Sequence, residues 1–480
     1  MFRITKTEQG IVEGLPAADP RITVFKGIPF AAPPVGNLRW APPQEPAKWE
    51  GVRQCFKYLA APVQPGPEEN PRVDDLYSKE WSVDTTLQLN EDCLYLNIWT
   101  PAKKTDEKLP VYFWIFGGGW QVGHASEMEF DGERIARRGI VVVTINYRVN
   151  LFGFTCHPEL TAEYPDSPAN QGLMDQHKAL EWVYKNISNF GGDPEQITIG
   201  GQSAGGGSVL NQISYKKNAP MIKRAVVESG FLLNPFFDVF PAKNLSQAEK
   251  VGEEFFEFCG VKTLKEAREL STEFLYQKWN EWGGFQKSAA TWTPVKDGQF
   301  ACFDFFDEVE KGNIVPPPLF TGYTPDEFKM GPLNQPDVEP INVVEYALRK
   351  VMNSLEKNGN PNKNYVYRFD VPMPGWDNPG RFHSADLWFF FETLAKCWRP
   401  FKGFHYDVSR QMCNYLCNFI KTGDVNGLDS YNCFACSKES DWETLPRWEP
   451  FSTEKNNFMI FEKDCKEINL PADENMKKYL

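Results

Sequence analysis

The sequence predicts an α/β protein built around one large, mostly parallel β-sheet. Apolar runs with the length and β-branched content of buried strands occur at residues 111–116, 140–145, 197–199 and 225–227. Between the second and third runs, Leu173, Leu180, Val183 and Ile187 recur on one face of a helical pattern. Buried strands that alternate with amphipathic helices are typical of a twisted parallel sheet with helices on both faces.

Composition and charge exclude several classes of protein. The 480 residues carry 51 Lys and Arg against 64 Asp and Glu, a net charge of −13. Nucleic acids and anionic membrane surfaces require a basic surface, so neither is expected as a partner. Hydrophobic content is 41% and the apolar runs are short, which indicates a folded soluble protein without a transmembrane helix.

The rest of the chain predicts a single domain over residues 1–480. Capping-box patterns begin helices at Ser246-x-x-Glu249 and Thr263-x-x-Glu266, and helical periodicity returns at 343–355 and 406–421. Residues 364–370 form a predicted strand, and Met459–Phe461 a predicted last edge strand. Because no Ser/Gly-rich linker separates these parts, we expect helical insertions at roughly 240–300 and 335–360 rather than further domains.

The cysteines and the N-terminus favour a cytoplasmic location. Eleven scattered Cys residues are unlike a disulfide framework, and Met1–Glu8 lacks the apolar stretch of a secretory signal. Cys433-x-x-Cys436 is a weak metal signal on its own, and Cys413 and Cys417 have the spacing of core residues on one helix face. We therefore expect neither a metal nor a cofactor.

The strongest local signal for chemistry is Gly201-Gln202-Ser203-Ala204-Gly205. It follows the predicted strand 197–199 and precedes an apolar helical pattern, which is the strand–turn–helix context of a nucleophile elbow. A simple Gly-rich turn is the alternative interpretation. A phosphate-binding loop is excluded, because no Lys-Ser/Thr pair follows the glycines.

A second signal is Phe116-Gly117-Gly118-Gly119-Trp120, which follows the strand residues Val111–Ile115. Successive glycines allow backbone N–H groups to point at a substrate oxygen without obstruction by side chains. This is the composition of an oxyanion-hole loop. A plain turn is the alternative, although three glycines would each add an entropic cost to it.

Elimination among five histidines leaves two candidates for a general base. Chain order in this type of site places the base after the nucleophile and the acid, which leaves His383 and His405. His383 lies in a loop after the strand 364–370, whereas His405 begins the long helix or lies on the surface. The adjacent carboxylates Asp326 and Glu327 follow the apolar Leu319–Phe320, and the residues alone do not choose between them.

The sequence resembles the type-B carboxylesterase family, which includes bacterial para-nitrobenzyl esterases and cholinesterases. The resemblance covers nearly the whole chain and rests on ordered motifs at Phe25–Arg39, Glu91–Trp99, Phe116–Trp120, Asn146–Arg148, Asn170–Gly172, Phe190–Pro194 and Gly201–Gly206. It implies an α/β-hydrolase fold with helical insertions over the active site.

The resemblance also implies site residues. Ser203 is expected to be the nucleophile, Glu327 the acid and His383 the base, with the oxyanion hole formed by the N–H groups of Gly118, Gly119 and Ala204. Ser229 is expected to lie behind the acid. The aromatic residues Trp120, Phe231 and Trp388 neighbour these loops in the sequence and are candidates for the substrate pocket.

These residues predict a serine carboxylic-ester hydrolase that acts on small or aromatic esters through an acyl-enzyme. A feruloyl or other hydroxycinnamoyl esterase is a narrower alternative, motivated by the 14% aromatic content. A non-catalytic binding homologue is a third, although such relatives typically lose triad residues. The triad does not determine the leaving group, so amides and carbamates remain candidate substrates. The expected partner is a small-molecule ester, and the sequence indicates no oligomeric state.

Two departures from the family pattern lead to further expectations. Secreted relatives pair the cysteine at Cys93 with one in a segment that here reads Ala61–Gln64 and has no cysteine, which leaves Cys55 as a conceivable substitute. Glu327 and His383 are only 56 positions apart, so a more open substrate entrance is expected. Of the aromatic run 388–391 after the base, we expect some side chains to lie in the core and others to face the substrate pocket.

Overall fold

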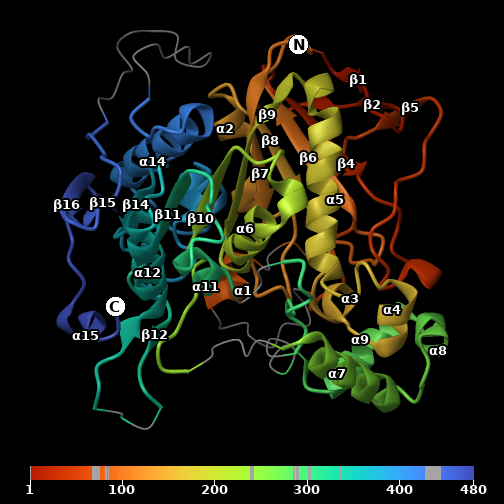
Figure 1. The fold of residues 1–480 in the computed structure, drawn as a ribbon. Coiled ribbons are helices and arrows are strands. Elements are labelled where there is room, and N and C mark those ends of the chain that lie inside the picture. The colour runs from red at the N-terminus through yellow and green to blue at the C-terminus, as the bar shows by residue number, and fades with distance from the viewer. Residues whose placement is uncertain are drawn as a thin grey trace.

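A computed structural model describes residues 2–66, 76–81, 84, 86–237, 243–284, 287, 291–300, 304–333, 335, 337–427 and 445–480. Cys433-x-x-Cys436 lies outside the described residues. Figure 1 shows the strands stacked side by side through the middle of the molecule, with helices packed around them.

Within the described residues, the main sheet has eleven strands in the order β16-β15-β14-β11-β10-β9-β7-β8-β6-β4-β3. Their bounds are β3 Leu15–Pro16, β4 Thr23–Pro29, β6 Tyr95–Thr100, β7 Leu109–Ile115, β8 Val141–Ile145, β9 Gly192–Gln202, β10 Arg224–Glu228, β11 Leu319–Tyr323, β14 Tyr365–Phe369, β15 Asn457–Phe461 and β16 Lys466–Asn469. β1 Ile4–Lys6, β2 Ile11–Glu13 and β5 Val52–Gln54 form a small second sheet, and β12 Lys329–Met330 pairs with β13 Ile341–Asn342.

The centre of the main sheet is parallel and its margins are antiparallel. From β8 through β7, β9, β10, β11 and β14 to β15 every pairing is parallel, whereas β3, β4, β6 and β16 run antiparallel to their neighbours. The predicted strands at 111–116, 140–145, 197–199, 225–227 and 364–370 are confirmed. Met459–Phe461 lies in a strand as predicted, within β15, but the prediction that this strand is the edge is wrong, because β16 pairs outside it.

The helices are α1 Leu76–Glu80, α2 Glu133–Ala136, α3 Asn150–Phe154, α4 Pro158–Glu163, α5 Gln171–Asn186, α6 Ala204–Ser214, α7 Leu245–Phe258, α8 Leu264–Glu269, α9 Thr272–Glu281, α11 Phe305–Glu310, α12 Val343–Lys357, α13 Leu387–Phe390, α14 Gly403–Thr422 and α15 Glu474–Lys477. α5 and α6 cover the face of the sheet turned to the viewer in Figure 1. α13 and α14 cover the other face, where Phe391 packs on Trp114 of β7 and Phe390 on Phe320 of β11.

Helix ends follow local hydrogen bonding, which corrects one prediction and decides between two alternatives for His405. The capping box of α8 is made by Thr263 and Glu266 as predicted, but α7 is capped by Asn244 with Gln247 rather than by Ser246. His405 lies in the first turn of α14 but is not on the surface. It is 3% exposed, and its Nδ1 accepts a hydrogen bond from the N–H of Lys402.

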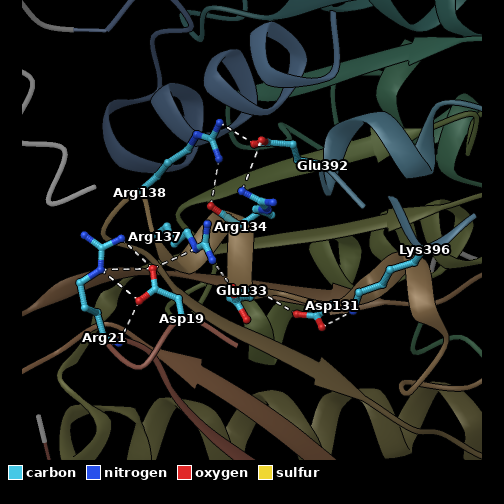
Figure 2. A network of polar contacts seen from close by, with 9 residues as sticks. All are labelled: Asp19, Arg21, Asp131, Glu133, Arg134, Arg137, Arg138, Glu392 and Lys396. Atoms are coloured by element: carbon cyan, nitrogen blue, oxygen red, sulfur yellow. Dashed lines mark hydrogen bonds and ion pairs between the residues drawn. The ribbon is translucent and has the colours of Figure 1, made fainter. Parts of the chain in front are cut away.

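A network of charged side chains joins α2 to segments distant in the sequence (Figure 2). Arg137 contacts Asp19 near the N-terminus, and Arg138 forms a 2.7 Å ion pair with Glu392, which follows α13. Arg138 also donates through Nε to Asn414 of α14. The network therefore connects the end of α2 to α14 and to the segment that follows α13, which comes after His383 in the chain.

The architecture is that of an α/β-hydrolase, as the sequence predicted. Because β7, β9, β11 and β14 are parallel, their carboxyl ends meet at one edge of the sheet, which is where such sheets carry their sites. The described residues include no helix with both the length and the apolar character needed to cross a bilayer.

Candidate active site

Ser203 lies on the sharp turn that connects β9 to α6. Its backbone has φ 56° and ψ −126°, a left-handed conformation that side chains rarely adopt. The glycines on both sides of this turn are required because a Cβ at either position would collide with the backbone. A Cβ on Gly205 would lie 2.2 Å from the carbonyl oxygen of Ile115, and one on Gly201 would lie 2.4 Å from that of Gly205. The turn therefore has the geometry of a nucleophile elbow.

The loop after β7 lies directly against this turn. A Cβ on Gly117 would be 3.2 Å from the Cβ of Ser203, and Gly118 and Gly119 have φ values of 102° and 66°. Among the described residues, no group accepts a hydrogen bond from the N–H of Gly118, Gly119 or Ala204. Three unpartnered backbone donors beside one hydroxyl form an arrangement that can bind an oxyanion.

His383 and Glu327 meet at the same edge of the sheet. Nδ1 of His383 forms a short hydrogen bond with Oε2 of Glu327, and the two side chains are 11% and 0% exposed. The other oxygen of Glu327 accepts a 3.0 Å hydrogen bond from the N–H of Thr324. A buried carboxylate held in this way fixes the orientation of the imidazole and can stabilise its protonated form.

The neighbouring carboxylate Asp326 points elsewhere. It accepts a 2.9 Å hydrogen bond from the N–H of Arg381 and forms a 3.2 Å ion pair with the Arg381 guanidinium. The structure thus places Glu327, and not Asp326, against His383.

The remaining imidazole nitrogen of His383 faces the elbow. Its Nε2 lies 3.4 Å from Nε2 of Gln202, the residue before Ser203. When Nδ1 carries the proton toward Glu327, Nε2 has a free lone pair that accepts from the Gln202 amide. This lone pair is also the site that a base needs to accept the Ser203 proton.

Aromatic side chains surround these groups in different ways. Phe328 packs edge-on against the His383 ring with centroids 4.5 Å apart. Trp120 packs beside Gly207 and donates through Nε1 to Ser208, and it is 7% exposed. Phe231 is 1% exposed and Trp388 is fully buried. The whole run 388–391 has no exposed surface, so its side chains form core.

The other singled-out residues are buried. Ser229 is 3% exposed, and its Oγ has no hydrogen-bond partner among the described residues, Glu327 included. His177 bonds Asn218, and His157 accepts from the N–H of Glu159 at the start of α4. Cys55 and Cys93 are both buried free thiols, so Cys55 does not replace the missing disulfide partner. Within the described part of the chain, no three His, Cys, Asp or Glu side chains are grouped to hold a metal ion.

Four residues near the site were not predicted from the sequence. Gln202 and Phe328 contact His383, and Glu228 and Asp386 are carboxyls with no exposed surface close to the elbow and the base. The available signal was position: Gln202, Glu228 and Phe328 each adjoin a residue that the motifs had already marked, and Asp386 lies three residues after His383.

Comparison with known proteins places the chain in a family. A model of the carboxylesterase family matches residues 2–343 and 341–478. The chain belongs to the carboxylesterase family. A fumonisin B1 esterase of Sphingopyxis macrogoltabida is 38% identical over 233 residues, which are 48% of this chain and 40% of that protein. A cholinesterase of Mus musculus is 41% identical over 230 residues, which are 47% of this chain and 37% of that protein. The matched segments thus span less than half the length of either relative.

Two solved esterase structures are similar to this chain over its whole length. A Geobacillus stearothermophilus carboxylesterase superposes with a TM-score of 0.78 at 26% identity, covering 100% of both chains. A PNB esterase superposes with a TM-score of 0.80 at 24% identity, also over 100% of both chains, which shows the shared fold.

Proposed function

We propose that this carboxylesterase-family chain hydrolyses carboxylic esters with Ser203 as nucleophile, His383 as general base and Glu327 as the acid that orients it. The observation that carries the proposal is the hydrogen bond between Nδ1 of His383 and buried Glu327, at a strained serine turn. It leaves the basic Nε2 of His383 directed at the elbow, where a serine hydroxyl requires a base.

In the proposed reaction, Nε2 of His383 takes the hydroxyl proton as Ser203 Oγ attacks the ester carbonyl carbon. Negative charge then develops on the carbonyl oxygen, and the free N–H groups of Gly118, Gly119 and Ala204 are placed to receive it. The imidazolium returns its proton to the departing alkoxide, which leaves an acyl-enzyme and the free alcohol. Water activated by His383 attacks the acyl carbon, and release of the acid restores Ser203.

We propose small-molecule carboxylic esters as substrates. Two named relatives are a fumonisin B1 esterase and a cholinesterase, which supports ester cleavage without selecting one acyl or alcohol group. The aromatic run 388–391 does not support a feruloyl ester, because all four side chains are buried. The narrower specificity therefore depends on a substrate panel.

The experiment is hydrolysis of p-nitrophenyl acetate by the native chain and by Ser203→Ala, with Ser246→Ala on the exposed start of α7 as a matched control. We expect Ser203→Ala to lower kcat by about a millionfold, as triad deletions do elsewhere, and Ser246→Ala to leave it unchanged. Longer p-nitrophenyl esters and methyl ferulate then rank acyl preference. A folded Ser203→Ala variant that keeps most of the activity would overturn the assignment, and an inactive native chain would favour a binding homologue.

A further inference from the structure

Two buried carboxyls lie behind the triad, and neither has a role in the reaction as described. Glu228 ends β10, and its carbonyl oxygen accepts the N–H of Ser203 at 2.9 Å. Asp386 comes three residues after His383 and precedes α13. Both residues are 0% exposed, and neither forms an ion pair with a Lys or Arg among the described residues. Each carboxyl is therefore linked to a triad residue by a short stretch of backbone.

The register of the sheet directs one tyrosine hydroxyl toward this region. Glu228 of β10, Gly322 of β11 and Tyr367 of β14 lie in one row across three parallel strands. A Cβ on Gly322 would lie 2.4 Å from the Tyr367 ring, so the ring covers this glycine on its way toward β10. The Tyr367 hydroxyl donates a 2.7 Å hydrogen bond to Oδ2 of Asp386. This is the polar contact that anchors the Asp386 carboxyl.

A second tyrosine approaches from the opposite side of β10. Tyr112 of β7 covers Gly200 of β9, where a Cβ would lie 2.5 Å from the Tyr112 hydroxyl, and Gly200 pairs with Val226 of β10. In the described part of the chain, the Tyr112 hydroxyl, both carboxyl oxygens of Glu228 and Oδ1 of Asp386 have no hydrogen-bond partner. Polar groups thus converge on β10 from both sides without a cation to balance a second negative charge.

Burial without a cation makes two charges here expensive. Burial, with the charge of Asp386 added, raises the pKa of Glu228 well above its usual range. Burial raises the pKa of Asp386 to about 6, with the Tyr367 hydrogen bond opposing the rise, the charge of Glu327 adding to it and a positive His383 opposing it. The other titratable groups that act on Tyr112 are the thiols of Cys413 and Cys417 on α14, which add to the effect of burial and raise the pKa of its hydroxyl. At neutral pH the pair is therefore expected to hold one proton.

We propose that Asp386 is a positioning residue for His383 and carries the negative charge of this carboxyl pair, because its neighbour Glu228 remains a neutral carboxylic acid. That charge favours the imidazolium that forms when His383 takes the Ser203 proton, in addition to the direct contact with Glu327. The role rests on the proposed ester hydrolysis. The protonation of the pair can be observed without turnover.

Two amide variants separate the two carboxyls. Asp386→Asn removes the negative charge, so the acid limb of the kcat/KM profile for p-nitrophenyl acetate should move to lower pH by about half a unit to one unit. The His383 ring titration followed by NMR should move in the same direction. Glu228→Gln replaces a neutral acid by a neutral amide, so it should leave both midpoints within about 0.2 pH unit. Glu129 is another buried carboxyl with a raised pKa, so the Glu228 signal is taken from the infrared difference spectrum between the native chain and Glu228→Gln, which should show the loss of one protonated carboxylic acid at neutral pH.

Several outcomes would overturn the pair. An acid limb that moves in Glu228→Gln as far as in Asp386→Asn would mean that Glu228 carries charge. A protonated-acid band of equal intensity in the native chain and in Glu228→Gln would place the proton elsewhere. An unmoved His383 titration in folded Asp386→Asn would remove the positioning role. If Asp386→Asn does not fold, Tyr367→Phe tests the same charge, because it removes the hydrogen bond that stabilises ionised Asp386. The same downward displacement is then expected. If the native chain does not hydrolyse the ester, the esterase proposal fails. The NMR and infrared measurements do not depend on turnover, so they still test the charge on Asp386 and the proton on Glu228.

Discussion

At the residue scale, the neutral side chain of Gln202 is a distinctive feature of the site. Its amide lies 3.4 Å from Nε2 of His383, so it donates to the neutral imidazole and cannot stabilise the imidazolium by charge. Gln202→Glu would place a carboxylate beside that nitrogen with little change of volume. The protonated, inactive ring would then persist to higher pH.

We therefore expect Gln202→Glu to move the acid limb of kcat/KM upward by about one pH unit. The measurement is the pH profile of p-nitrophenyl acetate hydrolysis. Gln212→Glu does not suit as a control because Gln212 is buried, whereas Gln247→Glu at the start of exposed α7 does. A profile that does not move, or moves downward, would contradict the proposed proximity of Gln202 to the catalytic base.

Sequence reasoning could find only part of the site. Chain order left His383 and His405 open, and the choice between Asp326 and Glu327 came from family resemblance, because both adjacent carboxylates fit the same pattern. Glu228 ends an apolar strand and Asp386 begins a short helix, and a single sequence does not show that distant strands bring such residues together. Their association depends on the register between β10, β11 and β14.

At the element scale, the ion pair of Arg138 and Glu392 joins α2 to the segment after α13 (Figure 2). The two side chains are 11% and 19% exposed, so removing one partner leaves a largely buried charge. Glu392→Gln should lower the free energy of unfolding by about 1–3 kcal/mol, as judged from such losses elsewhere. Denaturant unfolding measures this difference.

The matched control is Lys396→Gln, whose side chain is 41% exposed in its pair with Asp131. Exposed pairs contribute about 0–1 kcal/mol, so this variant should change stability little. Equal losses in the two variants would show that burial of the Arg138 pair has no special weight.

Elements with strong apolar periodicity could be predicted, and polar ones could not. β7 to β10 and α14 appear where buried runs and helical spacing indicated them. β16, with the sequence Lys-Glu-Ile-Asn, was not predicted because its residues do not alternate between apolar and polar. Its extended conformation depends on pairing with β15. The capping box of α7 was misplaced by two residues, since Asn244 with Gln247 fits the pattern as well as Ser246 with Glu249.

At the scale of the whole molecule, the buried carboxyl pair should affect how stability depends on pH. A carboxyl whose pKa is raised by folding binds more protons in the folded state than in the unfolded state, so stability falls as pH rises from its ordinary pKa to its raised one. For Asp386 that window runs from 3.8 to about 6, and for Glu228 it begins at 4.5 and extends well above it.

Replacing Glu228 by Gln removes its share of this pH dependence. Relative to the native chain, Glu228→Gln should therefore become progressively more stable between about pH 5 and pH 8, as measured by urea unfolding at several pH values. A stability difference that stays constant over this range would show that Glu228 titrates alike in the folded and unfolded states.

The fold class followed from strand and helix periodicity, but the strand order did not, because the sheet interleaves strands far apart in the chain. The aromatic residues, which make up 14% of the chain, lie mainly in the packed core. The run 388–391 fills the layer between the sheet and α14, and not an exposed pocket.

The most direct test of the account is covalent labelling of the native chain with a fluorophosphonate, followed by mass spectrometry of its peptides. We expect one phosphonyl adduct per chain, located on Ser203 and absent from folded Ser203→Ala. An adduct on another residue, or no adduct on a folded chain that hydrolyses p-nitrophenyl acetate, would contradict Ser203 as the nucleophile.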